Sequence, residues 1–173
     1  MHNKQINEHK AERFVSTGRI AIGSLDGFLT SSPLGSCVAV IAYDISTKIG
    51  GLAHVLLPGK SPKRNNNKYA ENAINNLIDE LKNLGALKTN IEICLIGGAN
   101  VLRKENDNIA NSLIISISKT LEKKKLSEIA SSLGGYERRT AKLILSSGIV
   151  NFTVGDSVET KLYQFIAENI IGE

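Results

Sequence analysis

Two stretches of helical periodicity stand out along the chain. Apolar residues recur at steps of three and four over positions 70–84, and Gly85 follows as a helix terminator. A second apolar stripe runs over positions 109–121, with Asp107 or Asn108 as the candidate N-cap. Each stretch predicts an amphipathic helix, and the first is expected to lay one face on a sheet.

Short apolar runs separated by turn residues predict β-strands around these helices. The polar segment 44–48 joins the first two long runs into a hairpin. Asp26-Gly27 is a turn signal among shorter strand segments over 19–29. The predicted main strands span 38–43, 49–57, 91–96, 127–131, 140–145 and 149–154.

The two ends of the chain give different predictions. Residues 1–17 show no periodicity and predict a mobile or loosely docked tail, whereas the apolar spacing over 158–170 predicts a third amphipathic helix. Strands near both ends and long helices between them indicate a single α+β domain over 1–173. We expect a layered α/β sandwich with a mixed, partly antiparallel sheet and two to three helices.

The predicted hairpin carries a candidate reactive pair. Cys37 lies at a loop-to-strand junction, and His54 lies in the returning strand. A turn centred between Ile45 and Ser46 sets Cys37 directly opposite His54, where Cβ atoms lie roughly 4.5–5.5 Å apart. A thiol within reach of an imidazole is the arrangement of an activated cysteine nucleophile. The backbone N–H groups of Ser36 and Cys37 are candidates for holding a developing oxyanion.

Each of these residues also has an ordinary structural explanation. A free cysteine is more often a small buried hydrophobic residue, and we favour that interpretation for Cys94, in the middle of an apolar strand. For His54 the alternative is a core histidine bonded to the backbone. His2 and His9 lie in the polar tail, where solvated side chains are expected. No CxxC, HExxH or paired-histidine spacing is present, so no metal site is predicted.

A third group is expected to orient the imidazole. The nearby candidates are the hydroxyls of Thr30, Ser31 and Ser32 and the carboxylate of Asp44. Asp44 is disfavoured because the turn lies at the far end of the hairpin from His54. The three hydroxyls precede the cysteine by five to seven residues and are better positioned. Ordinary turn chemistry is the common alternative for such a string.

Composition and charge narrow the function classes. The 173 residues are 42% hydrophobic and 22% charged, with a net charge of +4, as in an ordinary globular domain. Aromatic residues make up only 5%, with no Trp, so stacking side chains are scarce and no nucleic-acid partner is expected. No apolar run is long enough to span a bilayer, and residues 1–13 lack an export signal. We therefore expect a cytoplasmic protein without membrane insertion. The glycines at 97–98 lack the lysine of a phosphate loop, so no cofactor is predicted.

Several segments, taken together, carry a resemblance to a known family. They are LGSCV at 34–38, GLAHVLLP at 51–58, KYA at 68–70, GGA at 97–99, IAN at 109–111, and GG at 134–135 followed by Arg139 and the turn at 147–148. In this order and over this breadth, from about residue 23 to residue 154, the chain resembles the CheD family of chemoreceptor glutamine deamidases.

The resemblance implies a cysteine hydrolase that converts glutamines of methyl-accepting chemotaxis receptors to glutamates without a cofactor. It implies Cys37 as nucleophile and His54 as base, in a fold related to the cytotoxic-necrotising-factor toxins. It also implies docking with a CheC-type phosphatase where that partner is present. The family typically has threonine at the position of Ser31, so Ser31, or Thr30 beside it, is expected as the third residue.

Two other functions stay open at this stage. One is a regulatory binding protein that stimulates a CheC-type phosphatase, and the other is a cysteine hydrolase that acts on a different amide. The basic loop at 60–68 is a candidate surface for steering the protein toward an acidic partner. A monomer is the default expectation for the assembly.

Overall fold

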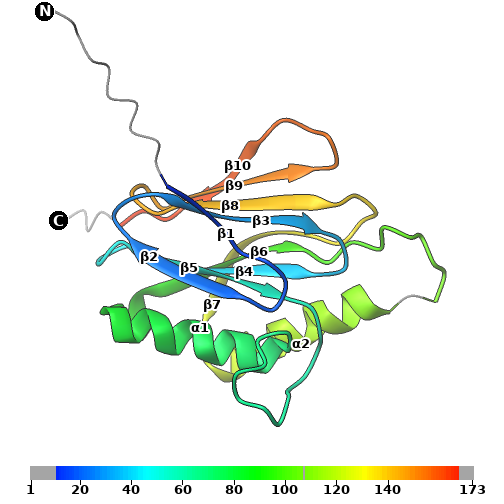
Figure 1. Ribbon diagram of the computed structural model, residues 1–173, viewed down its shortest axis with the longest axis horizontal. Coiled ribbons are helices and arrows are strands. Elements are labelled where there is room, and N and C mark those ends of the chain that lie inside the picture. The colour runs from blue at the N-terminus through cyan, green and yellow to red at the C-terminus, as the bar shows by residue number, and fades with distance from the viewer. Residues whose placement is uncertain (1–10, 107, 168–173) are drawn as a thin grey trace, which may run out of the picture.

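Three layers make up the part of the chain that the computed structural model describes, residues 11–106 and 108–167. Two α-helices lie on one face of a five-stranded sheet, and a second five-stranded sheet covers its other face (Figure 1). We call the middle layer the inner sheet and the other the outer sheet. The α+β layered sandwich predicted from the sequence is therefore confirmed.

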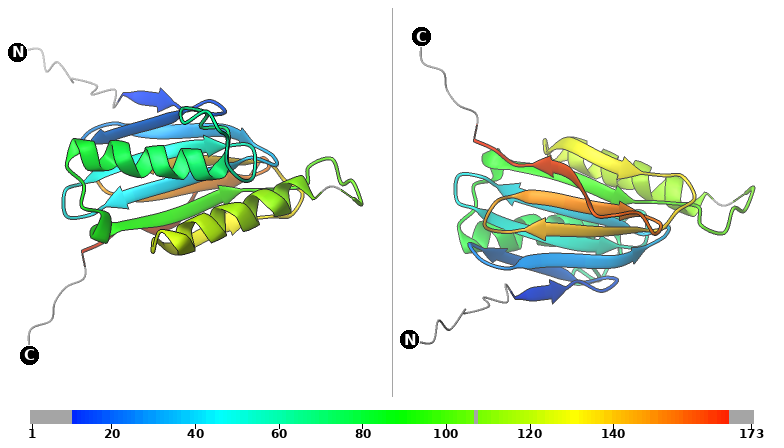
Figure 2. Two further views of the ribbon diagram at one scale, coloured as in Figure 1. Left: turned by 90° about the horizontal axis from the view of Figure 1, so that it is seen from below. Right: turned by 90° about the horizontal axis from the view of Figure 1, so that it is seen from above.

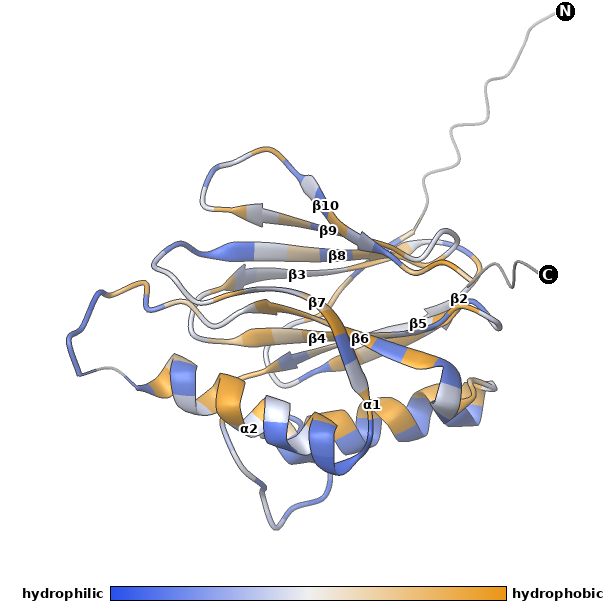
Figure 3. Cartoon of the chain, turned by 180° about the vertical axis from the view of Figure 1, so that it is seen from behind, coloured by the Kyte–Doolittle hydropathy of each residue, from blue (hydrophilic) through white to orange (hydrophobic). Residues whose placement is uncertain are grey.

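The inner sheet contains the predicted hairpin at its centre. Its strands lie in the order β2 (Ile20–Ser24), β5 (Ile49–Val55), β4 (Val38–Asp44), β6 (Ile91–Gly97) and β7 (Ser127–Leu133). Only β6 and β7 run parallel; the other neighbours are antiparallel. Every residue of β4 and β5 is buried, because this sheet is covered on both faces, and that explains the nearly continuous apolar sequence of β4 (Figure 3).

The outer sheet pairs the first described strand with the C-terminal half of the chain. Its order is β1 (Glu12–Phe14), β3 (Phe28–Leu34), β8 (Arg139–Ile144), β9 (Ile149–Val154) and β10 (Thr160–Gln164). Strand β1 runs parallel to β3, and the remaining pairs are antiparallel. Both sheets are thus mixed; the sequence predicted one mixed sheet, and the structure has two.

Helices α1 (Ala70–Leu84) and α2 (Ile109–Lys123) lie side by side on the inner sheet (Figure 2). Helix α1 ends at Gly85, whose φ of 117° is a left-handed conformation that glycine adopts at little cost. A short 3₁₀ helix, Lys88–Asn90, leads into β6. The apolar faces of both helices pack on the inner sheet in one hydrophobic cluster, while a second cluster fills the space between the two sheets.

The predictions for both ends of the chain need correction. The segment expected as a third helix, 158–170, contains strand β10, and residues 168–170 lie outside the described residues. Pairing with the free edge of β9 overrides the helical spacing here, and Phe165 stacks on the buried Tyr43 with ring centroids 5.0 Å apart. In the expected tail, residues 12–14 form β1 and Val15 is buried between the sheets, while residues 1–10 lie outside the description.

The loops around Cys37 lie at one end of the sandwich. The start of β4 and the ends of β5, β6 and β7 lie together, because Val38 is in register with both Val55 and Gly97, and Gly97 with Leu133. In the outer sheet, the end of β3 meets the start of β8 through Leu34 and Arg139. Among the described residues no helix has the length and apolarity needed to cross a membrane.

Candidate active site

The hairpin forms as predicted, but its register differs from the prediction by two residues. His54 lies opposite Ala39 and not opposite Cys37. The turn comprises residues 45–48 and is centred one residue later than expected. The Asp44 carboxylate sets this turn, since its Oδ1 accepts from the Ser46 backbone N–H at 2.8 Å and from the Ser46 hydroxyl at 2.6 Å. The prediction that Cys37 and His54 are directly opposed is therefore wrong.

A shift of two residues still leaves Cys37 and His54 on the same face of the inner sheet, because side chains alternate with a period of two. Cys37 packs against the hydrophobic cluster between the sheets, which also contains Ala39 and Leu52. A diagonal relationship of this kind separates the two residues by roughly 7–8 Å. Both side chains are described, and no hydrogen bond joins them. Cys37 is partly exposed, whereas His54 is only 3% exposed.

Ser31 reaches His54 across the gap between the sheets. Its hydroxyl lies 2.8 Å from His54 Nδ1 and donates to the Val15 carbonyl at 2.7 Å. A serine hydroxyl has one proton, and a carbonyl oxygen can only accept, so the Ser31 proton is committed to Val15. Ser31 Oγ must then accept from Nδ1–H, with the Val15 carbonyl as a second, longer acceptor at 3.4 Å. The network thus assigns the proton of neutral His54 to Nδ1 and leaves a lone pair on Nε2.

Strand alternation explains why Ser31 and not Thr30 contacts the imidazole. Leu29 and Ser31 both have no exposed surface, and Leu29 belongs to the cluster between the sheets. Thr30 points to the opposite face of β3, where its hydroxyl is buried and has no partner among the described residues. Asp44, disfavoured in the sequence analysis, lies at the far end of the hairpin and is engaged with the turn and with the Leu87 backbone N–H at 2.9 Å.

The segment from Val15 to Arg19 holds His54 from a side that the sequence analysis did not anticipate. The His54 backbone donates to the Arg19 carbonyl and accepts from the Gly18 N–H. Thr17 Oγ1 lies 3.5 Å from His54 Nε2, the atom with the lone pair. The sequence signal for this contact was weak, because Phe14 and Val15 are the only adjacent apolar pair in an otherwise polar stretch.

Burial shifts both candidate reactive groups toward their neutral forms. It raises the pKa of the Cys37 thiol above the ordinary value of 9.0. It lowers the pKa of His54 below the ordinary 6.5, and the hydrogen bond to the Val15 backbone opposes that shift only in part. At neutral pH the resting pair is therefore a thiol and a neutral imidazole, and not a preformed ion pair.

The backbone around Cys37 leaves two donors free. Gly98 N–H donates to the Cys37 carbonyl and Ala99 N–H to the Gly35 carbonyl, both at 2.8 Å. Gly98 has a φ of 66°, which ends the regular ladder, and no hydrogen bond from the N–H of Ser36 or Cys37 is found within the described residues. A Cβ at Gly97 would collide with the Cys37 carbonyl oxygen. The two backbone segments therefore approach each other closely at Gly97.

Comparison with known proteins identifies the family. A family model described as CheD chemotactic sensory transduction matches residues 56–153, which is more than half of the chain. The chain belongs to the CheD family. A probable chemoreceptor glutamine deamidase CheD of Chlorobium luteolum is 39% identical over 166 residues, covering 94% of this chain and 83% of the relative.

Two further CheD relatives are similar to most of this chain. A probable chemoreceptor glutamine deamidase CheD of Pyrococcus abyssi is 33% identical over 157 residues, 86% of this chain and 96% of the relative. The chemoreceptor glutamine deamidase CheD of Thermotoga maritima is 30% identical over 138 residues, 79% of this chain and 88% of the relative. The family model begins at residue 56, after His54. The alignment with the Chlorobium relative covers 94% of this chain, so it includes positions 31–54.

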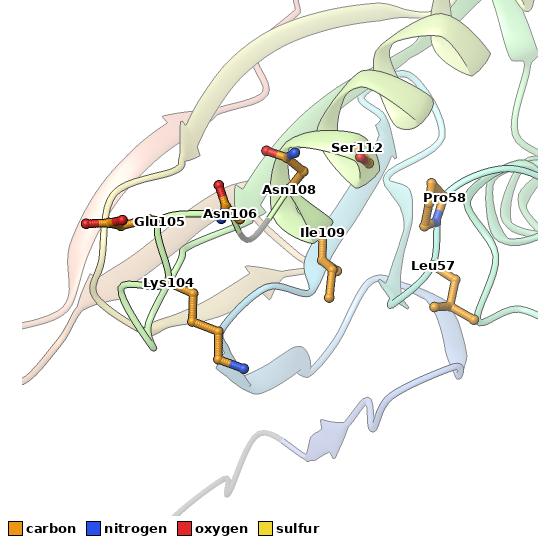
Figure 4. A pocket seen from close by; sticks show the side chains of 8 residues that line it. All are labelled: Leu57, Pro58, Lys104, Glu105, Asn106, Asn108, Ile109 and Ser112. Carbon is orange, nitrogen blue, oxygen red and sulfur yellow. The ribbon is translucent and has the colours of Figure 1, made fainter.

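Two hollows of this CheD-family chain lie at the same end as Cys37. One, of about 430 Å³, is lined by Ser36, beside the cysteine, together with Pro33, Gly35, Ala99, Val101, Leu102 and Arg138. The other, of about 860 Å³, lies between the segment after β5 and the start of α2. Figure 4 shows Leu57 and Pro58 on one side of this second hollow and Ile109 on the other.

Hydrogen bonds and ion pairs attach the basic loop after β5 to helix α1. Asn72 of α1 donates to the carbonyls of Ser61 and Lys63 and accepts from the Ser61 N–H. Lys60 pairs with Glu71 at 3.4 Å, and Arg64 with Asp79 at 3.9 Å. Two of the basic groups expected to steer an acidic partner are thus already paired with carboxylates of α1.

The remaining groups behave as ordinary structural residues. Cys94 is fully buried, and burial, with the nearby charges of Glu92 and Glu128, raises its pKa to about 12. This confirms Cys94 as a core residue. In residues 11–106 and 108–167 no cluster of histidine, cysteine and carboxylate side chains could hold a metal ion. His2 and His9 lie outside the described residues.

Proposed function

We propose that this protein is a protein-glutamine deamidase with Cys37 as nucleophile, His54 as general base and Ser31 as the residue that orients the imidazole. The observation that carries the proposal is the Ser31–His54 hydrogen bond of 2.8 Å. Because Ser31 donates to Val15, the bond fixes the imidazole tautomer with its lone pair on Nε2, on the same face of the sheet as Cys37. Metal and cofactor chemistry are not needed for this reaction.

In the first half-reaction the Cys37 proton passes to His54 Nε2 while the sulfur attacks the carbonyl carbon of a glutamine side chain. The N–H groups of Ser36 and Cys37 hold the resulting oxyanion. The imidazolium then returns its proton to the departing nitrogen. The C–N bond breaks, ammonia leaves and a thioester joins the substrate to Cys37.

In the second half-reaction a water molecule gives a proton to His54 Nε2 and attacks the thioester carbon. The C–S bond breaks, and the proton held by His54 returns to the Cys37 sulfur. The substrate is released as glutamate, and both side chains regain their starting forms. The overall reaction consumes one water for each amide and needs no oxidant or reductant.

Substrate binding must bring Cys37 and His54 closer than they are in the resting enzyme. Cys37 is partly exposed and precedes β4, and the proposal requires its side chain to rotate toward Nε2. The thiol would displace Thr17, whose hydroxyl contacts Nε2 over a long 3.5 Å. Catalytic hydrogen bonds are often long in unliganded enzymes and tighten when substrate binds.

The substrate class follows from the relatives. They are named chemoreceptor glutamine deamidases, and we extend that activity to this chain, with methyl-accepting chemotaxis receptors as substrates. A target glutamine must project from the receptor surface far enough to reach Cys37. A CheC-type phosphatase remains a candidate partner.

Mass spectrometry of receptor cytoplasmic fragments tests the proposal. After incubation with the wild-type protein, defined glutamines should show the amide-to-acid mass increase, and Cys37→Ala should abolish it. Cys94→Ala serves as the matched cysteine control and should retain the activity. No mass change with the wild type on any receptor fragment would contradict the proposal. Stimulation of a CheC-type phosphatase by both wild type and Cys37→Ala, without deamidation, would select the binding-protein alternative.

A further inference from the structure

One of the hollows described above shares a wall with a third hollow. The first, of about 430 Å³, is lined by Ser36 and by apolar side chains that include Val101 and Leu102. The second, of about 470 Å³, is lined mainly by polar and charged residues, several of them in the β7–β8 and β9–β10 connections. Pro33, Val101 and Arg138 line both. A mainly apolar pocket, lined by the residue before Cys37, thus adjoins a charged pocket, with Arg138 at the junction.

The charged groups of the second pocket differ in how far they are already engaged. Arg103 lies 4.0 Å from Glu137 and stacks over the Tyr136 ring at 5.0 Å. Arg139 is largely buried, and its guanidinium donates to Ser132 Oγ and the Gly134 carbonyl. These two arginines therefore build the pocket wall.

Arg138 is different from its neighbours. Its side chain is exposed, and no hydrogen bond or ion pair of its guanidinium is found within the described residues. Its backbone is nevertheless fixed, because the Arg138 carbonyl accepts from the Gly155 N–H at 2.7 Å. Asp156 also lines this pocket and supplies one opposing charge. Arg138 is thus a cation with a fixed backbone and with all its donors available, and it lines both the apolar and the charged pocket.

We infer that Arg138 binds a carboxylate of the substrate close to the glutamine that reacts with Cys37, while the apolar pocket receives a neighbouring hydrophobic side chain. A guanidinium offers a planar pair of donors that matches the two oxygens of a carboxylate. Leu102, which is 70% exposed at the rim of the apolar pocket, supplies the hydrophobic contact. The favoured substrate is therefore a glutamine flanked by an acidic and an apolar residue. This inference rests on the proposed deamidase function.

A charge swap between enzyme and substrate tests the inference. The probe is a receptor cytoplasmic fragment with a mapped reactive glutamine, made in three versions with Glu, Gln or Lys at the acidic positions within one helical turn of that glutamine. The wild type should deamidate the Glu version with a kcat/KM about tenfold above that of the Lys version. Arg138→Glu should reverse the order and favour the Lys version.

Lys119→Glu is the matched control for net charge. Lys119 is exposed on α2, outside both pockets, so this variant should keep the wild-type order of the three substrates. Alkylation of Cys37 by iodoacetamide at the wild-type rate would show that Arg138→Glu leaves the nucleophile intact. An unchanged preference of Arg138→Glu for the Glu version overturns the inference and leaves the deamidase proposal standing. A wild type that deamidates none of the versions overturns the deamidase proposal itself.

Discussion

Ser31 and His54 belong to different sheets and meet at 2.8 Å through Oγ and Nδ1. The contact crosses the apolar layer between the sheets, where an imidazole without a partner would be costly to bury. Ser31 and the Val15 carbonyl provide that partner and decide which nitrogen has the proton. The packing of the two sheets therefore also determines which tautomer the His54 imidazole adopts.

Removal of the Ser31 hydroxyl should weaken catalysis. We expect Ser31→Ala to lower kcat/KM by roughly 10- to 100-fold, because outer partners that orient an imidazole carry effects of that size. Ser31→Thr retains a hydroxyl and should restore most of the loss. Steady-state deamidation of a receptor fragment measures both. Wild-type activity in Ser31→Ala would remove Ser31 from the mechanism.

Thr30→Val is the matched control for Ser31. The Thr30 hydroxyl is buried and unpaired, so its replacement by a methyl group of similar shape should leave activity unchanged and raise the free energy of unfolding by about 1 kcal/mol. Urea denaturation measures the stability change. A large loss of activity in Thr30→Val would show that the wrong hydroxyl had been assigned.

The activity should persist into mildly acidic solution. His54 must be neutral to accept the thiol proton, and burial lowers its pKa below 6.5. The acidic limb of the kcat/KM profile for the free enzyme should therefore have its midpoint below pH 6.5. A midpoint above 6.5 would contradict a buried base.

The rate of Cys37 alkylation should still be rising with pH at pH 9.0, because burial raises the pKa of the thiol.

The same shift predicts a pH dependence of stability. Above pH 6.5, His54 is neutral in both folded and unfolded chains. As the pH falls below 6.5 the unfolded chain takes up the proton first, so the free energy of unfolding declines until the pH reaches the lower folded pKa. His54→Gln should flatten that window. Urea denaturation across the window, with both proteins, checks the sign.

Close approach of the backbone at Gly97 should be essential for the geometry of Cys37. Gly97→Ala places a Cβ against the Cys37 carbonyl in a backbone conformation of φ 127°, and we expect losses of both stability and deamidation. Gly59→Ala is the control, since Gly59 also has a positive φ of 77° but open space around it. It should cost only about 1 kcal/mol of stability and leave activity in place. Equal effects of the two variants would argue against the steric explanation.

Substitution of Asp44, at the turn end of the hairpin, should lower stability without changing the activity of the folded protein. Asp44 is fully buried; burial raises its pKa, but hydrogen bonds from Ser46, Leu87 and Thr47 outweigh this and lower it overall. Asp44→Ala leaves those donors without their acceptor and should destabilise the protein by roughly 1–3 kcal/mol. Activity per folded molecule should stay at the wild-type level. A selective loss of kcat in a fully folded Asp44→Ala would contradict this separation.

Much of the fold was predictable because its signals are local. Helix α1, the hairpin and strand β9 follow from apolar spacing and turn residues near each element. The register of the hairpin was not predictable, because it depends on contacts that the Asp44 side chain makes within the turn and with Leu87. The error was an even number of residues, so Cys37 and His54 stayed on one face.

Predictions failed where partners come from distant parts of the sequence. Strand β10 forms because β9 offers an edge and Tyr43 offers an aromatic partner to Phe165, and neither is visible in the spacing over 158–170. The polar sequence before Val15 shows no strand pattern, although residues 12–14 form β1, which pairs with β3. The choice between Thr30 and Ser31 needed the orientation of β3, which only the packed sheets determine.

Trapping of the acyl-enzyme is the most direct test of the account. Hydroxylamine added during turnover should intercept the thioester, releasing the Cys37 thiol and leaving a hydroxamate on the receptor glutamine, which mass spectrometry of the receptor fragment detects. We predict this product with the wild-type protein and with Cys94→Ala, and none with Cys37→Ala. Deamidation of the same glutamine by Cys37→Ala at the wild-type rate would contradict the account.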